Sequence, residues 1–204
     1  MLLHETEKVR SGLNALLRID PVFSKRNIGF DNFAWPYMGP GFATLTRIVL
    51  GQQVSTKAAD ALWLKFSSHI DNIHPATIIK LSNDSFHNLG ISRQKISYIK
   101  GLAEAVDSGS LDLDILNERD DRAVYEALTS LKGFGRWSAE MYLMFGLARP
   151  DIWAPGDLGI REGMRLYLER PDRPSPEEVM ACGERFKPYR TAASLLLWTM
   201  KAQG

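Results

Sequence analysis

Two short stretches of this chain carry the residue types best suited to chemistry. The first, Leu131-Lys132-Gly133-Phe134-Gly135-Arg136, places two glycines where one helical pattern ends and another begins. Without side chains at Gly133 and Gly135, the peptide N–H groups can approach a phosphate closely, and the dipole of the following helix favours negative charge there. Lys132 and Arg136 add local positive charge. The same glycines are also typical of a simple helix terminator, and their spacing leaves both interpretations open.

The second stretch ends in a carboxylate. Asp157 follows Pro155-Gly156 and precedes the helical pattern of Leu158, Arg161 and Arg165. This position suits a helix N-cap paired with Arg161 at i+4. A carboxylate at a helix N-terminus also stays ionised, as a group that stabilises positive charge in a transition state must. The position by itself favours the cap.

The elements that position these groups are predicted to be helices almost throughout, because apolar residues recur at spacings of three and four. Ser55 is suited to cap a helix whose apolar face is formed by Ala58, Ala59, Leu62, Trp63 and Phe66. Ser175-Pro176-Glu177-Glu178 combines a serine cap, a proline in the first turn and a glutamate three residues after the cap. Residues 192–200 are predicted to form a buried helix, since this apolar run is too short to cross a bilayer.

The composition limits the class of protein. With 204 residues, 45% of them hydrophobic, the chain can bury a large core. Its net charge of +1 does not indicate a broad basic surface for binding nucleic acid. Its single cysteine, Cys182, excludes an internal disulfide and any site built from several thiolates. The N-terminus lacks the features of a secretory signal. We therefore expect an intracellular, cytoplasmic protein, associated with the nucleoid if it is bacterial.

Four separated motifs, in this order, resemble the helix-hairpin-helix (HhH-GPD) superfamily of base-excision DNA glycosylases. They are Ile48–Ser55, Leu89–Lys95, the hairpin of residues 131–139 with the downstream Asp157, and Phe186–Arg190. The resemblance covers roughly residues 40–200 and is strongest to the alkyladenine branch, the bacterial 3-methyladenine DNA glycosylase II type, without that type's N-terminal β-domain.

This resemblance implies an all-α, two-lobed fold with a cleft between the lobes. Residues 1–204 would form one glycosylase domain, with a central helical lobe over about 40–150 and a second lobe from about 1–39 and 151–204. The implied partner is double-stranded DNA containing damaged bases. We expect no membrane association, no cofactor and a monomer.

The resemblance also assigns the chemistry. Asp157 matches the family's essential aspartate. In the implied reaction, an alkylated purine of the 3-methyladenine type is first flipped out of the duplex. The aspartate then stabilises the oxocarbenium-like sugar while the purine leaves. An abasic site remains. Members that also cut the strand carry a lysine directly after the hairpin, where this chain has Trp137, so we expect a monofunctional enzyme. The iron–sulfur branch, which needs four cysteines, is excluded.

Further positions match the family's base pocket and its wedge loop. Trp137 and Tyr189 match pocket positions, Met141 stands where relatives often have an aromatic residue, and Trp35 and Phe42 are candidates for the other side. Each could instead be core packing, the interpretation that we adopt for Trp63 and Trp198. Gln53 aligns with the residue inserted where the base has flipped out, although its loop could equally be a capping turn.

No catalytic metal is expected, because the four histidines lack metal-binding spacing. The resemblance does allow an alkali cation at the carbonyls of Leu131 and Gly133. The alternative from another class is a non-catalytic helix-hairpin-helix module that binds DNA without sequence preference. Such a module needs neither Asp157 nor an aromatic pocket.

Overall fold

The computed structural model describes residues 1–26 and 28–203. Within these residues the chain forms thirteen α-helices and no β-strand, apart from an isolated bridge between Leu2 and Pro36, so the all-α prediction is confirmed. None of the helices described is both long and apolar enough to cross a bilayer. The chain divides into two compact units, Met1–Met38 with Leu143–Gly204, and Gly39–Tyr142. That these units are the two lobes flanking a DNA-binding cleft stays a prediction.

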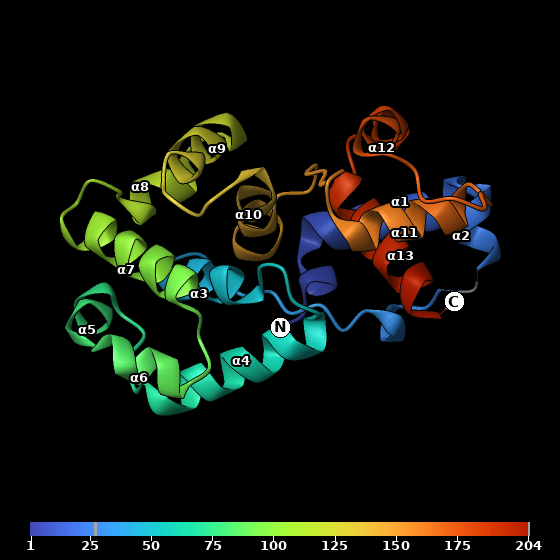
Figure 1. The fold of residues 1–204 in the computed structure, drawn as a ribbon. Coiled ribbons are helices and arrows are strands. Elements are labelled where there is room, and N and C mark those ends of the chain that lie inside the picture. Colours follow the sequence, from blue (N-terminus) through green and yellow to red (C-terminus); the bar gives the residue numbers. More distant parts are fainter. Residues whose placement is uncertain (27, 204) are drawn as a thin grey trace. The chain divides into compact units, whose positions relative to one another are not determined.

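The unit that contains both chain ends is built around one long helix. Figure 1 shows α13 with α11 and α1 packed against it, and these pairs also make the most extensive contacts of the unit. Residues 191–200 of α13 are all buried, which confirms the buried helix predicted there. The α-helices of this unit are α1 (Glu7–Ile19), α2 (Pro21–Lys25), α11 (Leu158–Tyr167), α12 (Pro176–Gly183) and α13 (Arg190–Gln203).

Local signals set where these helices begin. Ser175 Oγ accepts the N–H of Glu178, and the Glu178 carboxylate accepts the N–H of Ser175, so the predicted capping box at the start of α12 is confirmed. Asp20 caps α2 by accepting the N–H groups of Val22 and Phe23. Each cap satisfies backbone donors that the first helical turn leaves without partners.

Helices α11 and α13 approach each other closely at a glycine. A Cβ on Gly163 would lie 2.3 Å from the carbonyl oxygen of Leu197, a distance that no side chain can occupy. The two backbones can therefore meet only because residue 163 has no side chain.

The Gly163→Ala variant is expected to lower the free energy of unfolding by about 1–3 kcal/mol, because the added methyl group overpacks this crossing. For a chain of this size the melting temperature should fall by roughly 2–10 °C. Thermal denaturation followed by circular dichroism measures the change. An unaltered melting temperature would show that the helices separate without cost.

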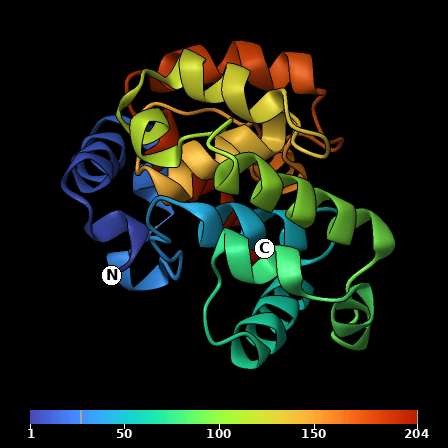
Figure 2. The same cartoon turned by 90° about the vertical axis from the view of Figure 1, so that its left-hand side faces the viewer.

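The other unit, Gly39–Tyr142, carries the hairpin. In it α7 packs against both α3 and α5, and α4 packs against α3 (Figure 2). The Ser55 hydroxyl accepts the N–H of Ala58, which confirms the predicted cap of α4. The helices of this unit are α3 (Phe42–Gly51), α4 (Thr56–His69), α5 (Pro75–Lys80), α6 (Asn83–Asn88), α7 (Arg93–Asp107), α8 (Leu113–Glu118), α9 (Asp121–Thr129) and α10 (Arg136–Met141).

Four short elements complete the fold. The 3₁₀ turns are η1 (Leu3–Glu5), η2 (Phe30–Asn32) and η4 (Glu184–Phe186), and a π turn, η3 (Tyr142–Gly146), continues α10. In the π turn the hydrogen-bonded ring is one residue wider than in an α-helix, a feature that is often found at functional sites.

Candidate functional site

Asp157 is the N-cap of α11. Its Oδ1 accepts the backbone N–H of Ile160 at 2.8 Å, so the cap predicted from the sequence is confirmed. The same oxygen accepts the indole Nε1–H of Trp198, also at 2.8 Å. Both donors therefore meet a single carboxylate oxygen, at the positive end of the helix dipole. Arg161, considered as an i+4 partner of this carboxylate, donates its Nε–H to the carbonyl of Pro174.

Trp198 belongs to a cluster of aromatic rings beside Asp157. Its ring centroid lies 5.2 Å from that of Trp35 and 5.7 Å from that of Phe145, with which it is stacked. The prediction that Trp198 packs in the core is confirmed, since it is 8% exposed. Its hydrogen bond to the candidate catalytic carboxylate was not predicted. The general signal was available, because a buried indole N–H needs an acceptor, but the sequence does not say which one.

The hairpin closes between α9 and α10. The N–H of Phe134 donates to the carbonyl of Leu131, and Gly133 has a φ of +89°, a conformation that favours glycine. A Cβ on Gly133 would lie 2.1–2.4 Å from ring carbons of Tyr98 on α7. At Gly135, the N-cap of α10, an added Cβ would meet no atom within 4 Å. Gly133 is thus required by the fold, whereas Gly135 leaves open space beside the start of α10.

The predicted wedge loop is tied to the hairpin by Gln52, a residue that no local sequence pattern distinguishes. Gln52 Nε2 donates to the carbonyl of Gly133 at 2.8 Å and to Ser138 Oγ at 3.0 Å. The next residue, Gln53, is exposed and has a φ of +57°. This anchored loop therefore holds Gln53 in a conformation uncommon for a residue with a side chain. Its role as a wedge stays a prediction.

A lysine holds the end of the helix that precedes this loop. Lys95 Nζ donates to the carbonyl of Leu50 at 2.6 Å, in the last turn of α3. Partial burial lowers the pKa of Lys95 below its usual range. Its cation lies at the negative end of the helix dipole and satisfies a terminal carbonyl, so the end of α3 is held where the loop begins.

The two basic residues of the hairpin differ in their surroundings. Lys132 is exposed. Arg136 Nε donates to the buried carboxylate of Glu140 at 2.8 Å, and its guanidinium lies over the ring of Tyr125, 5.9 Å from the centroid. The hydrogen bond and the charge of Glu140 raise the pKa of Arg136 above its usual value. Arg136 is held by its own unit, while its side chain is still 63% exposed.

The pocket candidates fall in both units. Trp35 and Tyr189 share a unit with Asp157, and Tyr189 packs against α1 at Gly12, where an added Cβ would lie 3.1 Å from the tyrosine Cβ. Trp137, Met141 and Phe42 lie in the unit of the hairpin. Trp137 is half-buried, whereas Met141 and Phe42 are only 5% and 7% exposed.

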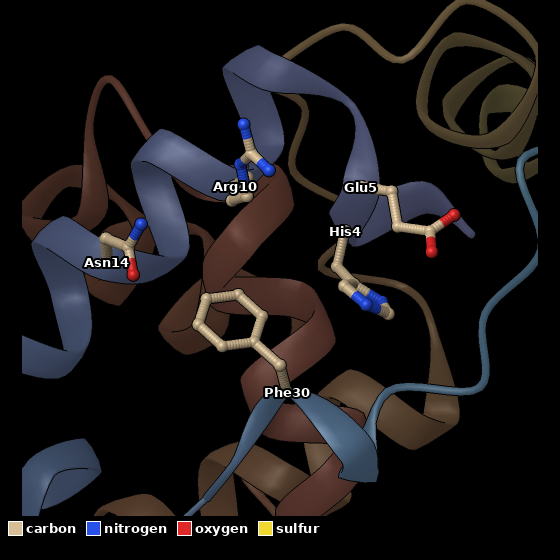
Figure 3. A pocket seen from close by; sticks show the side chains of 5 residues that line it. All are labelled: His4, Glu5, Arg10, Asn14 and Phe30. Carbon is tan, nitrogen blue, oxygen red and sulfur yellow. The ribbon is translucent and has the colours of Figure 1, made fainter. Parts of the chain in front are cut away.

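A surface hollow of about 240 Å³ lies elsewhere in the unit of Asp157. Figure 3 shows the side chains that line it, which come from η1, α1 and η2: His4, Glu5, Arg10, Asn14 and Phe30. None of the residues predicted to act on DNA is among them.

Known proteins match this chain over most of its length. Residues 46–188 match the family model of the HhH-GPD superfamily base excision DNA repair protein. A DNA-3-methyladenine glycosylase 1 of Schizosaccharomyces pombe is 36% identical over 161 residues, which are 77% of this chain and 71% of that protein. A DNA-3-methyladenine glycosylase of Saccharomyces cerevisiae is 27% identical, and the match spans 78% of this chain and 66% of the yeast protein.

A solved structure extends the similarity to three dimensions. The 3-methyladenine DNA glycosylase Mag1 of S. pombe, in complex with abasic DNA, superimposes with a TM-score of 0.84 at 31% identity. The match covers 92% of this chain and 95% of that one.

Proposed function

The chain belongs to the HhH-GPD superfamily of base excision DNA repair proteins and, within it, to the DNA-3-methyladenine glycosylases, and we propose that it removes N-alkylated purines from double-stranded DNA by hydrolysis. The observation that carries the proposal is the carboxylate of Asp157. It caps α11 in a member of this family, held by an indole and a backbone amide.

The proposed reaction breaks the bond between C1′ of the deoxyribose and the ring nitrogen of the purine. An alkylated purine of the 3-methyladenine type is cationic in DNA, so it takes the electron pair of that bond and leaves as a neutral base. Asp157 stabilises the positive charge that develops on the sugar. Water then adds to C1′ and loses a proton, which leaves an abasic site.

DNA is held, in this proposal, by the hairpin. Phosphates are contacted by two backbone amides, at Gly133 and Gly135, and by two cations, those of Lys132 and Arg136. Such contacts require no particular base sequence. The exposed Lys132 and the open space at Gly135 are consistent with such an approach. The carbonyls of Leu131 and Gly133 stay candidates for an alkali cation, although each already accepts one hydrogen bond.

The flipped base is proposed to stack on aromatic side chains. A cationic purine gains about 0.5–2 kcal/mol from a cation–π contact with an aromatic ring. Trp137 and Tyr189, both half-buried, are the first candidates, and Trp35, which belongs to the cluster of rings beside Asp157, is a third. Met141 and Phe42 are also proposed to belong to the pocket, although they expose little surface.

A panel of DNA duplexes, each with one defined lesion, tests the proposal. The lesions are 3-methyladenine, 7-methylguanine, 1,N⁶-ethenoadenine and hypoxanthine, and alkali cleaves the abasic site wherever a base has been removed. We expect excision of at least one alkylated purine and none from undamaged DNA. Failure on every alkylated purine, with DNA binding retained, would favour the non-catalytic module.

Treatment with borohydride during excision is expected to trap no covalent adduct. A Schiff base requires an amine at the sugar, and Trp137 stands in the position where strand-cutting relatives carry the lysine. A strand-cutting glycosylase on its own lesion provides the positive control, with denaturing gel electrophoresis as the measurement. A trapped adduct with this chain would contradict the monofunctional assignment.

We also propose that the protein acts as a monomer, in the compartment that holds the DNA. Sedimentation velocity with and without a short duplex measures the oligomeric state. We expect a monomer alone and a complex of one protein per lesion with the duplex.

A further inference from the structure

A tryptophan from α13 reaches the carboxylate that the proposed mechanism uses. Asp157 Oδ1 accepts both the N–H of Ile160 and the Nε1–H of Trp198, each at 2.8 Å. The first bond comes from the first turn of Asp157's own helix. The second comes from a residue 41 positions further along the chain. The carboxylate is therefore tied to two helices at once.

The indole that makes this bond is itself held in place. Trp198 is 8% exposed, stacks on Phe145 and contacts Trp35. A large ring that is packed on several sides has few alternative rotamers, because the neighbouring side chains fill the space into which it would turn. Its N–H is thus presented to Asp157 in one direction.

The space for this contact exists only because residue 159 is glycine. A Cβ on Gly159 would lie 2.6 Å from Cδ1 and 2.7 Å from Nε1 of Trp198, and 3.0 Å from Oδ1 of Asp157. Any side chain at this position would push the indole away from the carboxylate. The contact between Trp198 and Asp157 consequently depends on the absence of a side chain at Gly159.

We propose that Trp198 is a positioning residue for base excision, which orients the carboxylate of Asp157 toward the sugar. This inference rests on the proposed function. Two donors on Oδ1 fix the plane of the carboxylate and, with it, the position of Oδ2. A carboxylate that is already oriented stabilises the developing charge without turning first. Without the indole donor, Oδ1 would keep the N–H of Ile160 and lose the hydrogen bond that ties it to α13.

The Trp198→Phe variant tests this role, because phenylalanine keeps an aromatic ring and removes the donor. Single-turnover excision of an alkylated purine is expected to slow by about 10- to 100-fold, the effect of misplacing a reacting group slightly. Affinity for the same duplex, measured separately, should stay within about twofold, since the indole acts on the reaction rather than on binding.

Trp153→Phe is the matched control. Trp153 lies in the same unit, is 3% exposed and donates its Nε1–H to the carbonyl of Val179 at 2.9 Å. This substitution also removes a buried indole donor, and a similar loss of thermal stability is expected. The excision rate should stay at the wild-type level, because Val179 is bonded through its backbone and takes no part in the reaction.

A donor-free isostere keeps the test valid if Trp198→Phe fails to fold. Incorporation of 3-benzothienylalanine at position 198 replaces the indole N–H with sulfur and preserves the shape, and the same loss of rate is expected. A wild-type rate with the isostere, or an equal loss of rate in Trp153→Phe, would overturn the positioning role while the glycosylase assignment stands. A wild-type protein that excises no alkylated purine would instead overturn the proposed function itself.

Discussion

The Asp157→Asn variant is expected to excise alkylated purines at least about 10³-fold more slowly than the wild type, because the amide carries no charge to stabilise the cationic sugar. The substitution can keep both hydrogen bonds that Oδ1 accepts. Asparagine is an effective N-cap, and its carbonyl oxygen can accept the same hydrogen bonds from Ile160 and Trp198. The melting temperature and the affinity for abasic DNA should therefore change little. Single-turnover kinetics on a duplex with one lesion provides the measurement.

Asp112→Asn provides the matched control for this variant. Asp112 is likewise an N-cap aspartate, whose Oδ1 accepts the N–H of Ile115 at the start of α8. Replacing it makes the same chemical change at a helix end with no proposed role in excision, so the rate should be unaltered. Full activity of Asp157→Asn, with the control behaving as expected, would remove Asp157 from the mechanism.

The Gly133→Ala variant is expected to be the most damaging substitution in the hairpin. Its φ of +89° costs a residue with a side chain about 1–3 kcal/mol, and the collision of its Cβ with the Tyr98 ring adds about 1–3 kcal/mol more. We expect a melting temperature lower by roughly 4–24 °C and an affinity for DNA at least about tenfold weaker. Thermal denaturation and fluorescence anisotropy with a labelled duplex measure the two effects.

Gly135→Ala separates the role in DNA binding from the role in folding. Gly135 has a φ of −95° and open space beside it, so alanine should cost no more than about 1 kcal/mol of stability. Its methyl group would nevertheless stand beside the backbone amides proposed to meet the phosphate, and DNA affinity should fall. Unchanged affinity in this variant would argue against a phosphate at the hairpin.

The collision at Gly133 can itself be tested. Adding Tyr98→Ala to Gly133→Ala removes the ring that the methyl group meets, so the double variant should lose less stability than the two single losses added together. The loss of stability that comes from the positive φ at residue 133 should remain in the double variant. Simple additivity would show that the hairpin moves away from Tyr98 at no cost.

Much of the fold was predictable from the sequence, because helix boundaries depend on residues within one or two turns of each other. The caps at Ser55 and Ser175 and the buried helix of residues 192–200 were each predicted from local patterns, and the structure confirms them. The cap at Asp157 could be predicted in the same way, since its partner Ile160 lies three residues away. These interactions form wherever the local residue types are present.

The sequence also indicated the candidate chemistry, through the resemblance of its motifs to those of a known family. It identified the paired glycines of the hairpin, the carboxylate at Asp157 and the tryptophan at the lysine position. In contrast, it showed no partner for Trp198, which resembled any other buried aromatic residue on an apolar helix face. It also did not single out Gln52, which looked like one of two adjacent glutamines in a loop.

Only the tertiary structure decided what surrounds the hairpin and the carboxylate. Gln52 meets the Gly133 carbonyl across 81 positions of sequence, and Trp198 meets Asp157 across 41. A donor such as an indole N–H can satisfy any acceptor that packing brings near it, so its type carries no information about a distant partner. Asp157 was thus predictable as a cap and a candidate carboxylate. That an indole from α13 holds it, through space left by Gly159, follows only from the way α11 and α13 pack.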